Sequence, residues 1–223
     1  MKNFAVAIDG PAGAGKSTIA KIVAKDMQFV YVDTGALYRT IALFMLREGV
    51  DMASDEAIAA RLDKVSIDLR YVDNNQRVFL GSEDVSELIR TPEVSMGASR
   101  VSAVPAVRAF LLQLQRDMAD KYPVIMDGRD IGTVVLPNAD VKIFLSATAE
   151  ERAMRRYEEL KVKDPTTKYE DVLADMKQRD HNDSTRAAAP LKAADDAIML
   201  NTTGNTLEES VALIKQIIED AVK

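Results

Sequence analysis

Residues 10–17 read GPAGAGKS, which fits the pattern G-x-x-x-x-G-K-[ST]. The motif stands between a short apolar run at residues 4–8, expected to be a strand, and a segment expected to be a helix. Glycines allow successive backbone N–H groups to turn inward, and the helix N-terminus adds a partial positive charge. This strand–loop–helix context predicts a loop that binds the phosphates of a nucleoside triphosphate.

Two side chains of this loop carry specific expectations. Lys16 is expected to reach the β- and γ-phosphates, and the hydroxyl of Ser17 is expected to ligate Mg²⁺. The residues predicted to contact the triphosphate donor are Gly10, Pro11, Ala12, Gly13, Ala14, Gly15, Lys16, Ser17 and Thr18.

Four further apolar runs resemble the first, at residues 29–32, 124–126, 141–145 and 197–200. Their hydrophobicity is continuous rather than alternating, which is typical of strands buried on both faces of a parallel sheet. The sequence therefore predicts an α/β fold with a five-stranded parallel sheet covered by helices, the three-layer arrangement of phosphate-loop proteins.

Residues 51–93 differ in pattern from the rest of the chain. Residues 67–71 alternate between apolar and polar, Asp73-Asn74-Asn75 is a turn signal, and residues 77–80 resume extended structure. This pattern predicts an antiparallel hairpin inserted between the second and third strands of the sheet.

Helix starts are indicated by capping-box spacing, in which a threonine precedes a glutamate by three residues. The pairs are Thr148 with Glu151, Thr167 with Glu170, and Thr206 with Glu209. Pro105 is expected to begin a helix that runs to about residue 118. In the last helix one face is expected to pack on the sheet, formed by Leu207, Val211, Ile214, Ile217 and Ile218.

Composition excludes several function classes. The net charge of −6 argues against nucleic-acid binding through a broad basic face, and the absence of cysteine excludes disulfides, thiol catalysis and cysteine metal sites. The apolar run near the N-terminus is too short for a signal peptide or a membrane span. We expect a cytoplasmic protein that does not bind a membrane, and, since no coiled-coil pattern occurs, a monomer.

Two charged segments follow predicted strands. Residues 127–130, DGRD, leave open whether two carboxylates around a guanidinium hold a metal, contact a substrate or only form a turn. After the second strand, Asp33 or Thr34 could serve only as a helix N-cap. Arg39 lies about one turn further on, where it could meet a second anion.

Arginines gather towards the C-terminal part of the chain. On a helix, Arg179, Asp183 and Arg186 would share one face, which is compatible with a solvated salt-bridge stripe. The preceding helix adds Arg152, Arg155 and Arg156, and residues 161–167 are expected to be a mobile connection. Phosphoryl transfer needs cations brought over the transferring group by a closing segment, so these residues are candidates for a lid. His181, the only histidine, is expected to face solvent.

Five segments occur in the order and spacing of one known family. IDGPAGAGKST, DTGALYR, DGRDIGTVV, VKIFL and RDHNDSTRAAAPL make the whole chain, insertion included, resemble the bacterial cytidylate kinases, relatives of adenylate kinase. DTGALYR together with DGRDIG is far more specific than the phosphate loop alone. The resemblance implies transfer of a phosphoryl group from ATP, assisted by Mg²⁺, to CMP or dCMP.

The resemblance also implies residue roles on the acceptor side. Arg39, Arg129 and Arg186 would bind the acceptor phosphate. Ser99, Arg108 and Asp130 would hydrogen-bond the cytosine, and Asp183 and Arg179 would contact the sugar or the adjacent phosphate. The acceptor-binding residues implied are Asp33, Thr34, Tyr38, Arg39, Ser99, Arg108, Arg129, Asp130, Arg179, Asp183 and Arg186, of which Arg129, Arg179, Asp183 and Arg186, with Lys16, are expected to be catalytic.

Three details refine this expectation. Thr34 stands where the family often has serine, which retains the hydroxyl. Ser99 and Arg108 would point in opposite directions on one continuous helix, so a break at residues 104–105 is needed for both to reach one ligand. Asp127, at the strand edge, is expected to hold water on Mg²⁺ beside Ser17.

The expected organisation is one nucleoside monophosphate kinase domain over residues 1–223. Its parts are a core at about residues 1–50, 94–150 and 187–223, an acceptor-binding insertion at about 51–93, and a short helical lid at about 151–186.

Two alternatives remain open. One is a kinase for another small acceptor, such as UMP, another monophosphate or a sugar acid, although two acceptor-side arginines favour a phosphorylated one. The other is a nucleotide-dependent switch, although the sequence has no Asn-Lys pair of a guanine-binding signature.

Overall fold

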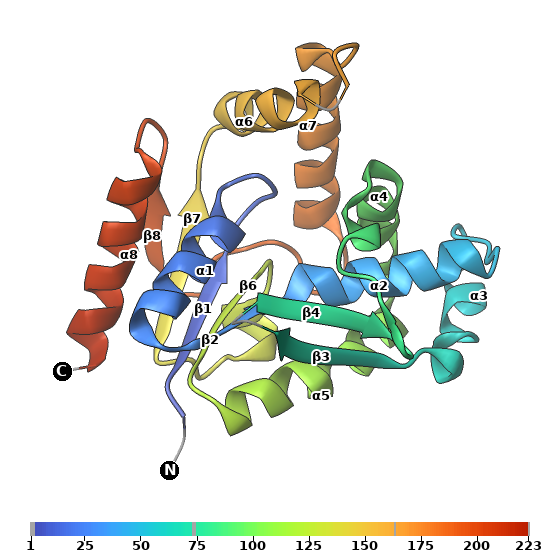
Figure 1. Cartoon of the computed structure of the whole chain (residues 1–223), viewed down its shortest axis with the longest axis horizontal. Helices are drawn as coiled ribbons and strands as arrows, with labels where there is room; N and C mark the ends of the chain where they lie inside the picture. Colours follow the sequence, from blue (N-terminus) through green and yellow to red (C-terminus); the bar gives the residue numbers. More distant parts are fainter. Residues whose placement is uncertain (1–2, 73–74, 163, 223) are drawn as a thin grey trace.

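A computed structural model describes residues 3–72, 75–162 and 164–222. Its centre is a five-stranded parallel sheet of order β2-β6-β1-β7-β8 (Figure 1). The strands are β1 (Ala5–Asp9), β2 (Val30–Asp33), β6 (Val124–Gly128), β7 (Val141–Ser146) and β8 (Ile198–Asn201). All five strands predicted from the apolar runs are confirmed, most of them displaced by about one residue.

Side chains on β1 alternate between two cores, which is why the run is apolar throughout. Val6 and Ile8 face a core shared with α1 (Lys16–Met27) and α8 (Leu207–Val222). Ala5 and Ala7 face the core on the opposite side of the sheet, to which α5 (Pro105–Lys121) contributes. The predicted three-layer arrangement is therefore confirmed.

The predicted hairpin is present as β3 (Ile67–Val72) and β4 (Asn75–Leu80), which pair antiparallel. The strand β5 (Glu83–Asp84) adds to β4 and was not predicted. Asp73 and Asn74 of the expected turn lie outside the described residues. Around the hairpin lie α3 (Asp55–Ala59), the short 3₁₀ helices η1 (Leu62–Lys64) and η2 (Leu88–Arg90), and α4 (Pro92–Val101).

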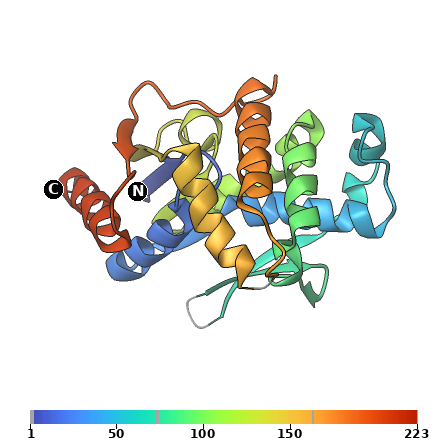
Figure 2. The same cartoon turned by 90° about the horizontal axis from the view of Figure 1, so that it is seen from above.

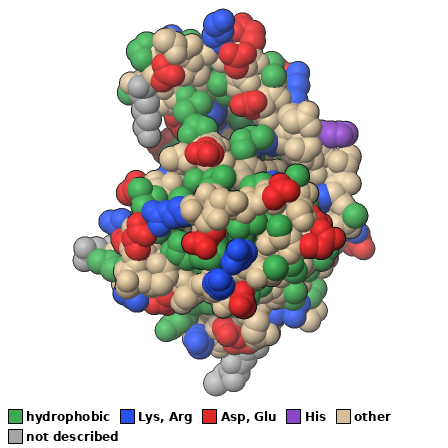
Figure 3. Space-filling view, turned by 90° about the vertical axis from the view of Figure 1, so that its right-hand side faces the viewer, with side chains coloured by type: hydrophobic (Ala, Val, Ile, Leu, Met, Phe, Trp, Pro, Cys, Tyr) green, Lys and Arg blue, Asp and Glu red, His purple; other side chains and the backbone are tan. Residues whose placement is uncertain are grey.

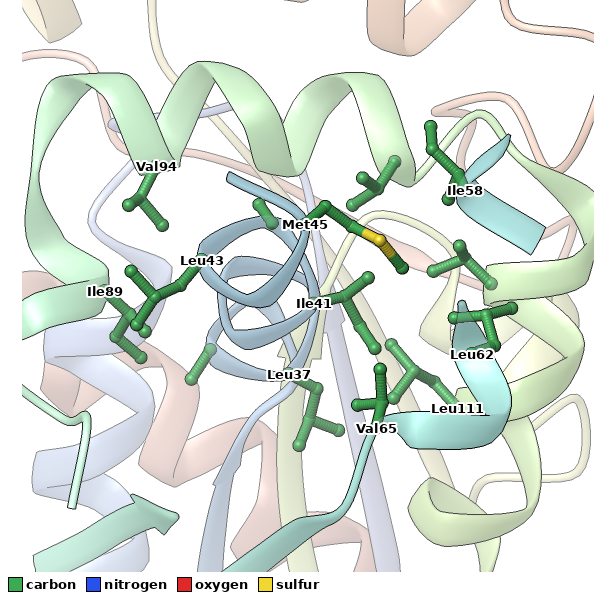
Figure 4. Close-up of a cluster of buried hydrophobic side chains, with 14 of the residues drawn as sticks. Leu37, Ile41, Leu43, Met45, Ile58, Leu62, Val65, Ile89, Val94 and Leu111 are labelled. Carbon is green, nitrogen blue, oxygen red and sulfur yellow. The ribbon is translucent and has the colours of Figure 1, made fainter. Parts of the chain in front are cut away.

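The insertion packs on α2 (Thr34–Arg47), which carries apolar side chains around most of its circumference. Leu37, Ile41 and Met45 of α2 are fully buried against residues of α3, η1, η2, α4 and α5 (Figure 4). The helix that leaves β2 is thus the shared core element between the sheet and the insertion.

Two helices, α6 (Ala149–Lys161) and α7 (Tyr169–Thr185), stand above the sheet at its carboxyl edge (Figure 1). They bury a small core of Ala153, Val172 and Met176 between them, and α7 runs beside α4 (Figure 2). Thr148 caps α6 as predicted, by accepting a hydrogen bond from the Glu151 N–H. The cap predicted at Thr167 is wrong, because α7 begins at Tyr169 after Lys168.

The last helix has the complete capping box, with reciprocal bonds between Thr206 and Glu209. Ile214 and Ile218 are fully buried as predicted, but Leu207, in the first turn of the helix, is exposed. Nowhere in the described residues does a helix have the length and apolarity needed to cross a membrane.

Candidate active site

One cleft of about 390 Å³ lies where the phosphate loop, the ends of β2 and β6, α4 and the α6–α7 pair meet. It brings together residues predicted for the donor side, the acceptor side and the lid, which are far apart in the sequence. The predicted site residues that line it are Ala12, Gly13, Lys16, Ser17, Asp33, Thr34, Tyr38, Arg39, Ser99, Arg108, Asp127, Arg129, Asp130, Arg152, Arg155, Arg156, Arg179, Asp183 and Arg186.

Five predicted loop residues do not line this cleft. They are Gly10, Pro11, Ala14, Gly15 and Thr18. Ala14 is buried in the core, and Gly15 precedes α1 with a φ of 86°, a left-handed conformation that favours glycine. We infer that these residues shape the loop; their contact with a donor nucleotide stays a prediction.

Lys16 is held inside the phosphate loop. Its Nζ donates a hydrogen bond to the Pro11 carbonyl at 2.8 Å. Burial, followed by repulsion from Arg129, lowers the pKa of Lys16 to about 7. A bound triphosphate would favour the charged amine and raise this pKa again.

Beside Lys16, Ser17 and Asp127 form a direct pair. The Ser17 Oγ donates to Asp127 Oδ2 at 2.7 Å, and the Tyr31 hydroxyl donates to Asp127 Oδ1 at 2.9 Å. Asp33 is the register partner of Asp127 on the neighbouring strand. Burial, and then the Asp33 charge, raise the pKa of Asp127.

This donor set suits Mg²⁺ that is shared with nucleotide phosphates. The part of the chain that the structure describes has no cluster of three or more His, Cys, Asp or Glu side chains able to form a closed metal cage. Mg²⁺ in nucleotide sites is typically held by one or two protein oxygens, phosphates and water. A hydroxyl next to a buried carboxylate, at the loop that binds phosphates, fits that coordination.

The start of α2 combines two functions. Asp33 is the N-cap residue, because its carboxylate accepts from the Ala36 N–H at 2.9 Å. The same carboxylate also pairs with Arg39 at 2.8 Å, so capping is not its only contact. Thr34 donates its buried hydroxyl to the Asp127 carbonyl at 2.7 Å, which ties α2 to the end of β6.

Asp130 lies between two arginines of the acceptor side. It contacts the Arg108 guanidinium directly, and Arg186 lies 3.8 Å away. Arg108 comes from α5 and Ser99 from α4, so the expected break at residues 104–105 is confirmed. The Arg108 guanidinium also lies 5.6 Å from the Tyr38 ring centre, which is within cation–π range.

Asp183 is the second carboxylate between arginines. It accepts from the Arg129 Nε at 2.8 Å and lies 3.9 Å from Arg186. The prediction that Arg186 shares one helical face with Arg179 and Asp183 is wrong. Helix α7 ends at Thr185 and Arg186 has extended dihedral angles, so Arg186 reaches the cleft from the chain after the helix.

Two nitrogen donors on the acceptor side are buried without acceptors. Among the described residues nothing accepts a hydrogen bond from the Arg39 Nε or from the Arg186 Nη2. Burial of an unpaired guanidinium N–H is costly, and an anionic ligand between these arginines would satisfy it. Overall, nine basic and five acidic side chains line the cleft, a surplus of four positive charges in a chain of net charge −6.

The three lid arginines differ in their surroundings. Arg152 is buried and bonded to protein groups on three sides, whereas Arg155 and Arg156 are partly exposed and pair with glutamates on their own helix, Glu151 and Glu159. Their roles towards a γ-phosphate stay predictions. His181 is exposed on α7, and Figure 3 shows the histidine side chain projecting from a surface of intermixed acidic and basic groups.

Some residues of the site have no local signal in the sequence. The Ser102 Oγ accepts from the Arg186 Nη1 at 3.1 Å, and the Ser95 carbonyl accepts from the Arg179 Nη2 at 3.0 Å. Asp9 is buried below the site and accepts two backbone N–H bonds from the segment after Asp130. These contacts join segments that are distant in the chain, which motif spacing does not reveal.

A phosphate loop at the carboxyl edge of a parallel sheet, facing arginine–carboxylate clusters across one cleft, defines a phosphate-loop kinase of small molecules. The family model described as cytidylate kinase matches residues 6–220. The chain belongs to the cytidylate kinase family, and the resemblance found in the sequence is confirmed.

Curated relatives match over nearly their whole length. The chain is 48% identical over 223 residues to a cytidylate kinase of Caldicellulosiruptor bescii, covering 100% of this chain and 99% of the relative. It is 50% identical over 219 residues to a cytidylate kinase of Caldicellulosiruptor saccharolyticus, covering 98% of this chain and 96% of the relative. A solved structure of an uncharacterized protein from Eubacterium ventriosum is similar to this chain with a TM-score of 0.55 and 13% sequence identity. The match covers 97% of this chain and 99% of the solved one, and it shows a shared fold.

Proposed function

We propose that this chain transfers the γ-phosphoryl group of ATP to CMP or dCMP, giving ADP and the cytidine diphosphate. The observation that carries the proposal is the single cleft in which Lys16 and Ser17 face the arginines of the acceptor side. The two unpaired guanidinium donors, on Arg39 and Arg186, favour an acceptor that already carries a phosphate.

On the donor side, the loop N–H groups and Lys16 bind the triphosphate. Ser17 would hold Mg²⁺, with Asp127 orienting its water, and the ion would neutralise charge on the donor phosphates. The pair between Ser17 and Asp127 supports this assignment.

On the acceptor side, Arg39, Arg129 and Arg186 bind the monophosphate. Cytosine presents an amine donor beside ring-nitrogen and carbonyl acceptors. The carboxylate of Asp130 suits the amine, and Arg108 and Ser99 suit the acceptors. Asp183 and Arg179 contact the sugar or the adjacent phosphate.

The reaction requires no general base, because the attacking phosphate oxygen is already anionic near neutral pH. This oxygen bonds to the γ-phosphorus as the bond from that phosphorus to the bridging oxygen of ADP breaks. Rate acceleration comes from alignment and from positive charge around the transferring group. Lys16 and the arginines of α6 and α7 supply that charge.

The organisation that we propose is one kinase domain whose parts serve these roles. The sheet with α1 carries the donor loop, and the insertion at about residues 51–93 supports the acceptor site through α2. Residues 151–186 act as a lid, whose two helices, α6 and α7, are joined by a small shared core.

A coupled assay of ADP release tests the proposal, run with ATP and Mg²⁺ against CMP, dCMP, UMP, AMP and GMP. We expect CMP and dCMP to stimulate ADP release at least about tenfold over the other acceptors, a difference of about 1.4 kcal/mol in the barrier. Stimulation by UMP alone would reassign the acceptor. Slow hydrolysis that no monophosphate accelerates would indicate a nucleotide switch and refute the kinase.

A further inference from the structure

Asp9 is a buried acid that the mechanism above does not use. It is the last residue of β1, directly before the phosphate loop, and only 4% of its surface is exposed. Its Oδ1 accepts from the Ile131 N–H and its Oδ2 from the Gly132 N–H, both at 2.8 Å. Both carboxylate oxygens are therefore bonded to the segment that follows Asp130.

That segment is η3 (Ile131–Val135), a single π-helical turn that begins after Asp130. A helix start normally has its free N–H groups capped by the residue that precedes it. Asp33 caps α2 in this way, by accepting from the Ala36 N–H. Asp130 occupies the same position before η3 but makes no such bond.

The side chain of Asp130 is instead directed to the acceptor side, where it contacts Arg108 and lies near Arg186. Asp9 thus caps the turn in place of Asp130, from a strand 122 residues away in the sequence. If Asp9 did not accept these bonds, Asp130 would be the nearest acid able to cap the turn, and its carboxylate would compete between the turn and Arg108.

The surroundings of Asp9 allow its carboxylate to be ionised at neutral pH, although burial disfavours the charged form. Burial raises the pKa of Asp9 to about 6, against the lowering effect of its two N–H donors; Asp130 raises it further and Lys16 lowers it. From β7, Lys142 lies beside Gly132 and directs its amine to Asp196. At neutral pH the carboxylate is therefore ionised and can accept both bonds.

We propose that Asp9 is a positioning residue for the acceptor base: it caps the turn after Asp130 and thereby leaves the Asp130 carboxylate to Arg108 and the acceptor. This inference rests on the proposed function, because it gives Asp130 the role of base recognition. Asp9 itself does not line the cleft.

Asp9→Asn tests the proposal, because the side chain keeps one carbonyl acceptor and presents an NH₂ group to the other N–H donor. Asp9→Ser is the more severe variant. The matched control is Asp140→Asn, because the Asp140 Oδ2 also accepts from a backbone N–H of β1, that of Ala5 at 2.8 Å, at the opposite end of the strand.

We expect Asp9→Asn to raise the KM for CMP about tenfold, equivalent to about 1.4 kcal/mol, and Asp9→Ser to raise it further. The KM for ATP should stay within about twofold in both, and Asp140→Asn should change neither KM. Partial unfolding would raise the apparent KM for both substrates by the same factor, so a rise for CMP alone distinguishes the proposed effect from a loss of folded protein.

Two outcomes would overturn the proposal: an unchanged KM for CMP in both Asp9 variants, or equal rises for CMP and ATP, which would place the effect in the phosphate loop. The parent enzyme distinguishes this failure from failure of the proposed function. If the parent prefers another monophosphate, the same comparison is made with that acceptor.

Discussion

The Arg152 Nη1 on α6 donates a hydrogen bond to the Ala12 carbonyl of the phosphate loop at 2.8 Å. The same guanidinium donates to the Ala147 carbonyl, directly after β7, and pairs with Asp180 of α7 at 2.5 Å. One buried side chain therefore joins the phosphate loop to both α6 and α7.

Replacement of Arg152 by glutamine should destabilise the protein by about 2 to 3 kcal/mol, because it breaks a buried ion pair and leaves buried carbonyl groups unpaired. Urea denaturation of the unliganded protein measures this. Arg156→Gln is the control, since the pair of Arg156 with Glu159 is exposed and should contribute about 0.5 kcal/mol or less. Equal losses in the two variants would contradict the structural role of Arg152.

Arg129→Ala should raise the KM for CMP by about 10- to 100-fold, the range expected for loss of a charged hydrogen bond to phosphate. The KM for ATP should change far less, because Arg129 is bonded to Asp183, which we propose to lie on the acceptor side. Steady-state kinetics with each substrate varied in turn measures both constants. Parallel increases in the two would argue against an acceptor role.

Removal of the Ser17 hydroxyl should weaken the binding of Mg²⁺. In Ser17→Ala we expect the Mg²⁺ concentration for half-maximal rate to rise about tenfold, since one of few protein ligands is lost. A Mg²⁺ titration at saturating ATP and CMP measures the shift. An unchanged midpoint would place the ion elsewhere.

Gly10→Ala should prevent stable folding or cost more than about 3 kcal/mol. An added Cβ at this position would lie 1.9 Å from the Leu145 carbonyl oxygen of β7, and the φ of Gly10 is 146°. Gly49→Ala is the matched control, because Gly49 also has a positive φ, 63°, but a Cβ would meet nothing within 4 Å. The control should cost about 1 kcal/mol. Thermal unfolding of both variants shows whether close packing or the backbone conformation alone makes glycine necessary at position 10.

Asp9 should make stability depend on pH in a defined window. Its pKa is raised from 3.8 to about 6 in the folded protein, so the folded state binds a proton more readily than the unfolded state between these values. The stability that this proton provides is present below about pH 4 and is lost as the pH rises through about 6. Relative to Asp9→Asn, the parent should therefore lose up to about 3 kcal/mol between pH 4 and 7. A difference that stays constant with pH would show that Asp9 is not perturbed.

Much of the fold could be predicted because its strands are buried on both faces. Val6 and Ile8 point to one core and Ala5 and Ala7 to the other, so β1 has a continuous apolar run that the sequence displays directly. The errors in predicted burial concern positions where packing in the folded protein, rather than spacing along a helix, determines exposure. Leu207 has the helical spacing of a core residue, but it is the first residue of α8 and is exposed.

The site could be predicted only where its residues belong to local motifs. The phosphate loop and DGRD appear as contiguous segments, whereas Arg186 has the spacing of a helical residue although the helix ends before it. Asp9 and Ser102 were missed because their partners are selected by the folded sheet and by α4, at separations that a sequence pattern does not specify.

The carboxylates that lie between the arginines have a consequence for binding in salt solutions. The carboxylates of Asp33, Asp130 and Asp183 act as built-in counter-ions to the arginines, so fewer mobile anions gather on the unliganded cleft than its nine basic side chains alone would attract. When a monophosphate binds, the arginines exchange a carboxylate partner for the phosphate, and few chloride ions are released. Nucleotide capture by this protein should accordingly tolerate changes in ionic strength better than its number of arginines suggests.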